Sequence, residues 1–125
     1  MSYEVKGMCV GLKAAAAVTT KYAPVKISAA DTFAVAGAAD AADVIGFVQT
    51  EGVLGEALPV MINGITFAVA SAAITAGAKV APAAGGKIVT AAAKAASIGR
   101  AVNAATADGD VISVLIDCQA ADTIA

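Results

Sequence analysis

The fold is decided by two stretches that echo each other: "VIGFVQTEGVLGEALPVMI", residues 44–62, and "SIGRAVNAATADGDVISVLI", residues 97–116. Each begins with an Ile-Gly pair in a short apolar run, passes through small or polar residues, and returns through glycine, an acid and a second apolar run. Such runs separated by turn residues predict β-hairpins. The pair Gly55-Glu56 matches Gly109-Asp110. The echo favours two similar β-units around one core, although β-proteins also reuse hairpins without any internal repeat.

The echo extends upstream, where "DTFAV" at 31–35 matches "GGKIV" at 85–89. Short β-branched runs at a spacing of roughly ten residues, with turn signals between them, are typical of an all-β sandwich or barrel. The predicted strands are 3–12, 22–27, 32–36, 44–50, 57–62, 65–70, 79–82, 86–90, 98–104 and 110–117.

The helix candidates are "VAGAADAAD" at 35–43 and "TAAAKAAS" at 90–97. Both are too short to be stable without packing, so we expect compact loops or single helical turns. The expected fold is therefore mainly β. We expect a small, tulip-like barrel or sandwich in a single domain over residues 1–125, with two pseudo-repeated units and at most short helical turns.

The composition indicates a protein that is covered by partners. Hydrophobic residues make up 59% of the chain, aromatic residues 4% and charged residues 14%. Much of the apolar content is alanine, which buries little area, and soluble monomers usually carry about a quarter charged residues. Because binding to the folded state alone stabilises it, we expect other subunits to cover much of this surface.

Charge and patterning argue against nucleic-acid and membrane partners. The formal net charge of −2 provides no basic footprint for nucleic acid and no polybasic membrane anchor. An uncharged run at 57–78 is interrupted by Pro59 and Gly64, and its large residues alternate with small ones at 65–69, which is the period of a strand. The first residues lack the pattern of a signal peptide, so we expect synthesis in the cytoplasm.

The sequence offers no catalytic, metal or cofactor site. It contains no histidine, which excludes Ser-His-Asp and Cys-His nucleophiles and histidine-containing metal sites. Two carboxylate pairs, Asp40/Asp43 and Asp108/Asp110, lie close in sequence. Calcium binding and acid–base catalysis both use such pairs. Turn chemistry is the preferred interpretation, because no further ligand follows at loop spacing.

The two cysteines, Cys9 and Cys118, lie near opposite ends of the chain in apolar runs. One pair is too few for a disulfide framework, so buried, reduced thiols are the preferred interpretation. A bond between them would require the terminal strands to be neighbours.

One alternative function is a lipoyl- or biotinyl-like carrier domain. Gly85-Gly86 is predicted as a two-residue hairpin turn, and Lys87 directly after it suggests a modified lysine. In such carriers the lysine is flanked by Asp or Met, whereas here its neighbours are Gly86 and Ile88. A secreted structural or adhesive β-protein is a third hypothesis, against which the missing signal pattern argues.

The segment from Ala73 to Ile116 resembles the capsid cement, or head decoration, proteins of tailed bacteriophages. The resemblance rests on an Ile-x-Ala-Gly start at 74–77, a Gly-rich hairpin, an Ala-rich link at 91–96, Ile98-Gly99-Arg100-Ala101, and "ADGDVISVL" at 107–115. Residues 47–65 resemble the family's N-terminal half more loosely. The tail "DCQAADTIA" extends beyond the family's usual last strand.

The resemblance implies a non-enzymatic, β-rich protein on the outer surface of the virion, made in the host cytoplasm. Its implied partner is the major capsid protein, bound where capsomers meet, and its implied assembly is a homo-oligomer, with a trimer favoured. Its implied role is to stabilise the mature shell against the pressure of the packaged DNA.

The N-terminal segment, residues 1–13, is the candidate capsid-binding arm, because an extended strand can add to an exposed sheet edge. The alternative is that it forms the first strand of the barrel. As an arm, it should be removable, so that deletion of residues 2–13 abolishes capsid binding and leaves a soluble fold. The candidate contact residues are Ser2, Tyr3, Glu4, Val5 and Lys6.

Overall fold

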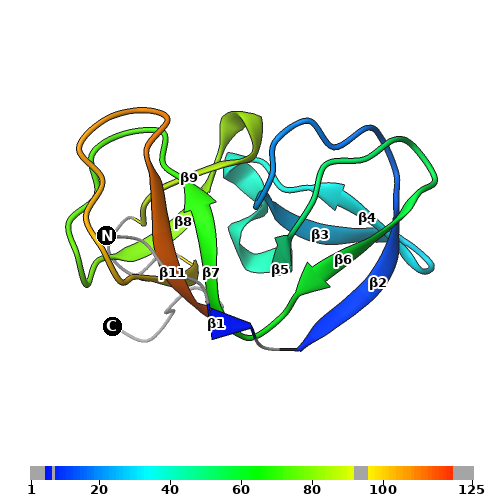
Figure 1. Cartoon of the computed structure of the whole chain (residues 1–125), viewed down its shortest axis with the longest axis horizontal. Helices are drawn as coiled ribbons and strands as arrows, with labels where there is room; N and C mark the ends of the chain where they lie inside the picture. The colour runs from blue at the N-terminus through cyan, green and yellow to red at the C-terminus, as the bar shows by residue number, and fades with distance from the viewer. Residues whose placement is uncertain (1–4, 7, 92–95, 120–125) are drawn as a thin grey trace.

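The fold was analysed in a computed structural model, whose described residues are 5–6, 8–91 and 96–119. Its strands form a closed barrel and a six-stranded sheet that lie side by side (Figure 1). The mainly β fold predicted from the sequence is confirmed. The elements are β1 (Val5–Lys6), β2 (Cys9–Ala14), β3 (Pro24–Ala29), β4 (Thr32–Val35), η1 (Ala38–Asp43), β5 (Val44–Val48), β6 (Ala57–Met61), β7 (Gly64–Val69), β8 (Lys79–Ala83), η2 (Ala84–Gly86), β9 (Lys87–Thr90), β10 (Ser97–Ala101) and β11 (Val111–Gln119).

The first unit, residues 9–61, is the closed barrel, with strand order β2-β4-β3-β5-β6. Its neighbouring strands are antiparallel except β2 and β4, which pair in parallel and close the barrel. The barrel is filled by apolar side chains that alternate along the strands, as the period of a β-strand requires. From the strands these are Ala14, Val25, Phe33, Val48, Leu58 and Val60, and the segment between β2 and β3 adds Val18 and Ala23.

The second unit, residues 64–119, forms with β1 the sheet with strand order β1-β7-β11-β10-β8-β9. The end of β7 approaches β9 at one parallel bridge, Ala70 with Ile88. This bridge takes the place of the β2–β4 pairing that closes the first unit. The short strand β1 pairs with the other end of β7, through Val5 with Ile65.

The second unit repeats the first strand for strand. β2 corresponds to β7, and β3 to β6 correspond to β8 to β11. The register is the same: Val25 lies opposite Gly46 in the first unit, and Val80 lies opposite Gly99 in the second. The structure therefore supports the two pseudo-repeated units indicated by the sequence echo.

The Ile-Gly pairs of the echo have a packing reason. A Cβ atom on Gly46 would collide with the carbonyl oxygen of Met61, and one on Gly99 would lie 2.5 Å from that of Leu115. Only glycine allows the two backbones to approach so closely. The same local requirement therefore appears at the same place in both units.

One part of the predicted alignment is off by one residue. The segment 31–35 was matched with 85–89, whereas β4, Thr32–Val35, corresponds to β9, Lys87–Thr90. The hairpin before β9 also differs from the predicted two-residue turn. It is the three-residue η2, Ala84–Gly86, in which both glycines have a φ of 77°.

The two units share a core through the outer side of the barrel strands β5 and β6. Val48 and Val60 point into the barrel, and their neighbours Phe47 and Met61 join the core of the second unit. Both Phe47 and Met61 are fully buried. The helical turn η1, which confirms the short turn predicted there, packs against β8 and β10. The other candidate, residues 90–97, includes 92–95, which lie outside the described residues.

Candidate functional site

The predicted N-terminal arm divides between the two sheets. Ser2, Tyr3 and Glu4 lie outside the described residues, and Val5 and Lys6 form β1 at the edge of the second sheet. Residues 9–14 form β2, which is hydrogen-bonded to β6 and β4 inside the barrel. The alternative interpretation, a first barrel strand, therefore holds for residues 9–13. Deletion of residues 2–13 would open the barrel, so a soluble fold is no longer expected from it.

A hollow of about 260 Å³ lies between the units. Thr20 donates a hydrogen bond from Oγ1 to the carbonyl of Gly85, 3.0 Å away, across its edge. None of the described side chains that line the hollow is charged, and its polar side chains are the hydroxyls of Thr19 and Thr20. Its lining consists of Ala17, Thr19, Thr20, Val35, Ala36, Gly37, Gly85 and Gly86.

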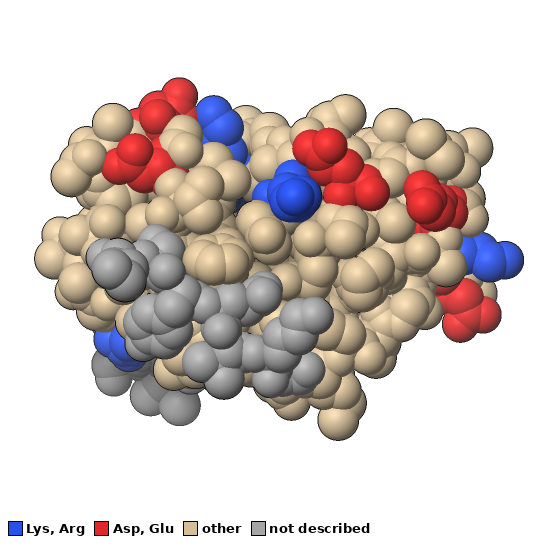
Figure 2. Space-filling model, viewed as in Figure 1, with Lys and Arg blue, Asp and Glu red and all other residues tan. Residues whose placement is uncertain are grey.

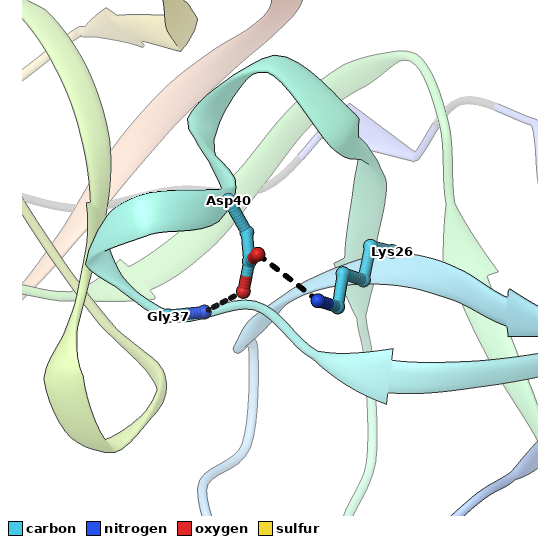
Figure 3. Close-up of polar contacts among 3 residues, drawn as sticks. All are labelled: Lys26, Gly37 and Asp40. Atoms are coloured by element: carbon cyan, nitrogen blue, oxygen red, sulfur yellow. Dashed lines mark hydrogen bonds and ion pairs between the residues drawn. The ribbon is translucent and has the colours of Figure 1, made fainter.

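Asp40 anchors the turn η1 to the barrel (Figure 3). Its Oδ2 accepts a hydrogen bond from the backbone N–H of Gly37 at 2.8 Å, and its Oδ1 pairs with Lys26 Nζ at 2.9 Å. The Gly37 amide, followed by Lys26, holds the pKa of Asp40 below its ordinary value of 3.8. This contact orders the segment that packs against the second unit, so Asp40 has a structural role.

Asp110 shapes the turn between β10 and β11. Its Oδ2 accepts hydrogen bonds from the N–H of Thr106 at 2.8 Å, the Thr106 hydroxyl at 2.8 Å and the N–H of Ala107 at 3.2 Å. These donors, the Thr106 amide above all, hold the pKa of Asp110 below its ordinary value of 3.8. Glu56 does similar work in the first unit, where its Oε1 accepts from the N–H of Val53 at 3.0 Å.

Of the two carboxylate pairs, Asp40 and Asp110 therefore accept hydrogen bonds from their own turns, as their sequence context predicts. Within residues 5–6, 8–91 and 96–119, no group of three or more cysteines and carboxylates is placed to hold a metal ion. Lys87, the candidate carrier lysine, pairs with Asp108, with its Nζ 2.8 Å from Oδ1.

Cys9 departs from the sequence expectation of a buried thiol. It is a free, exposed cysteine on β2. The apolar run around it suggested burial, but β2 alternates and Cys9 falls on its outward face with Gly11 and Lys13. The side chain of Cys118 lies outside the described part of the chain.

The surface is sparsely charged, and Figure 2 shows wide areas without Lys, Arg, Asp or Glu between the charged groups. Six large hydrophobic side chains are exposed among the described residues: Met8, Ile27, Val53, Leu54, Val111 and Leu115. Two of them, Val111 and Leu115, lie on β11. Val53 and Leu54 are consecutive residues in the turn between β5 and β6, and sequence reasoning did not identify their exposure. The signal was present, because "VL" stands between Gly52 and Gly55 inside the predicted turn.

No helix in the described ranges is both long and apolar enough to cross a membrane. A model of the phage cement protein family matches residues 6–116, which covers both units. The chain belongs to the phage cement protein family. No match was found among curated proteins.

The cement family is structural and non-enzymatic, and it supports a cement role on a phage capsid. The match begins at Lys6 in β1 and includes all of the barrel and most of β11. For a cement protein the functional residues are those that contact the capsid, so the exposed surfaces are the candidate site.

Proposed function

We propose that this cement protein is a non-enzymatic decoration of the phage head, bound to the major capsid protein on the outer surface at the junctions of capsomers. It is made in the host cytoplasm and stabilises the mature shell. The observation that carries the proposal is the family match over residues 6–116. The sparse charge and the exposed apolar side chains support it, because both suit a surface covered by protein. The whole chain acts as one decoration domain.

The proposed assembly is a homotrimer. In the first unit Phe47 pairs with Met61 on the outer side of β5 and β6, and both are covered by the second unit. The corresponding pair in the second unit is Arg100 with Leu115, which is exposed. A face that is covered in one repeat and open in the next favours a head-to-tail contact with another copy. Such contacts form closed rings when the rotation between copies allows it.

The proposed capsid-binding arm is residues 2–6. The pairing of its last two residues, Val5 and Lys6, with β7 at the edge of the second sheet supports this proposal. Deletion of residues 2–4 leaves β1 and β2 in place, so it should weaken binding to undecorated heads without lowering the melting temperature. Occupancy can be measured by sedimenting heads with the wild type or the truncated protein. Wild-type occupancy by the truncated protein would contradict the arm.

The stabilising role predicts that heads lacking this protein assemble but release DNA at a lower temperature. A site filled at 100 times its dissociation constant gains about 2.7 kcal/mol by linkage, and many sites act together on one shell. DNA release should be measured against temperature for undecorated heads and for heads saturated with purified protein. Identical release curves at full occupancy would show that the protein decorates the shell without stabilising it.

A further inference from the structure

The turn between β5 and β6 displays two consecutive large apolar side chains. Val53 is 66% exposed and Leu54 is 70% exposed, the highest values among the large hydrophobic residues that are described and exposed. Exposed apolar side chains gain free energy when a partner removes them from water. A pair at the tip of a turn can enter a concave surface on another protein.

The turn is held firmly at its base. Gly52 and Val18 exchange both backbone hydrogen bonds, at 2.8 and 3.2 Å. The N–H of Gly55 donates to the carbonyl of Ala14 at 2.8 Å, and the φ of Gly55, 81°, suits glycine. A pre-ordered turn loses less conformational entropy when it binds than a flexible one does.

The second unit builds the corresponding turn, which is one residue longer, without large apolar residues. Ala105 and Ile74 form the equivalent bridge, with both bonds at 2.9 Å, and Gly109 donates to Ala70 at 2.8 Å. The residues between them are Thr106, Ala107 and Asp108. Folding of this turn therefore does not require large apolar side chains, and Val53 and Leu54 call for another explanation.

The charges beside the pair indicate the chemistry of its partner. Glu51 and Glu56 are exposed and flank it within the chain. A cation, Lys13, lies near this turn, because it pairs with Ala57 at the start of β6. An apolar tip between two carboxylates fits an apolar pocket whose rim is basic, because rim charges of opposite sign steer encounter and fix orientation.

We propose that Val53 and Leu54 form an apolar anchor that inserts into a basic-rimmed pocket of the capsid shell protein. The anchor rests on the proposed cement function and specifies where the protein touches the shell. It is separate from the N-terminal arm, because the turn lies in the barrel and β1 lies on the second sheet.

The test uses undecorated heads and purified full-length protein. In the double variant Val53→Thr, Leu54→Ser the turn keeps its backbone contacts and loses its apolar surface. Burial of a side chain of this size contributes roughly tenfold or more to affinity, so the dissociation constant should rise about a hundredfold while the melting temperature stays unchanged. The matched control, Ile27→Thr, removes an exposed apolar side chain from β3 and should bind heads like the wild type.

Two further measurements identify the occupant. Glu51→Lys should weaken binding at low salt and approach the wild type at high salt, since screening removes the rim contribution. A photo-crosslinking side chain at position 54 should link to the shell protein on decorated heads. Crosslinks confined to a second copy of this chain would overturn the proposed occupant.

The failures of the two proposals are distinguishable. If the wild type does not bind heads, the cement function fails and the anchor fails with it. If the wild type binds and the folded double variant reaches the same occupancy with the same affinity, the cement function stands and the anchor is wrong.

Discussion

The two units have the same strand register, but they differ on the outer side of one hairpin. In the first unit this side carries Phe47 and Met61, both fully buried in the core of the second unit. In the second unit the corresponding residues are Arg100 and Leu115, both exposed. The features that the two units share are those that the fold needs. The features in which they differ mark surfaces with different neighbours.

The turns at the ends of these hairpins differ in the same way. Each is braced by a two-residue bridge and by a carboxylate, Glu56 in the first unit and Asp110 in the second. The tip is apolar in one case and polar in the other. The bridge and the carboxylate therefore stabilise the turn in both units, whereas the side chains at the tip differ between the units.

The largest expected effect is at the contact between the units. Phe47→Ala removes a fully buried ring from the shared core and should lower the free energy of unfolding by about 3–5 kcal/mol. The matched change, Arg100→Ala, removes a side chain that is exposed in the single chain and donates one hydrogen bond to the carbonyl of Gly77, so in the dissociated protein it should cost about 1 kcal/mol. Urea unfolding of the two variants measures both values.

The same two variants also test whether the outer side of β10 is covered in solution. Equal losses for Phe47→Ala and Arg100→Ala would mean that the outer side of β10 is covered in solution, as in a tightly associated oligomer. A repeat of the urea titration at several protein concentrations distinguishes this case, because dissociation makes the transition depend on concentration.

The sequence predicted the repeated hairpins well because their requirements are local. The Ile-Gly pairs reflect a close backbone approach, and the acids after Gly55 and Gly109 bind amides of their own turns. Such signals lie within a few residues of one another, so they can be read without knowledge of the distant packing.

The contact between the units could not be predicted, because both faces of β5 and β6 are apolar. Phe47 and Val48 are adjacent in sequence and bury themselves in different cores. Alternation identifies a strand with one solvated face, and it fails when both faces are covered. Cys9 shows the opposite error. The apolar run around it predicted burial, but Cys9 lies on the outward face of β2 and is exposed.

The exposed apolar pair in the first turn is the other feature that sequence reasoning did not identify. The turn residues around Val53 and Leu54 predicted a loop correctly, but the exposure of both side chains depends on the bridge between Gly52 and Val18. That bridge joins segments far apart in sequence. The second unit has a corresponding bridge between Ile74 and Ala105. The comparison of the two turns shows that the large apolar side chains occur only in the first.

The smallest expected effect concerns the carboxylate that braces the second turn. In the folded chain the pKa of Asp110 lies below its ordinary value of 3.8, because the amide and hydroxyl of Thr106 and the amide of Ala107 bind its charged form. The stabilisation is therefore present in full above the ordinary value and is lost as the pH falls through the lowered one. In Asp110→Asn the charge is absent at every pH, so the variant should melt below the wild type near neutral pH, and the two melting temperatures should converge in acid. Thermal unfolding from neutral pH down to about 2 measures this difference, with Glu51→Gln, a change at an exposed carboxylate, as the control. A gap of constant size across that range would show that Asp110 supports the turn through its shape and not through its charge.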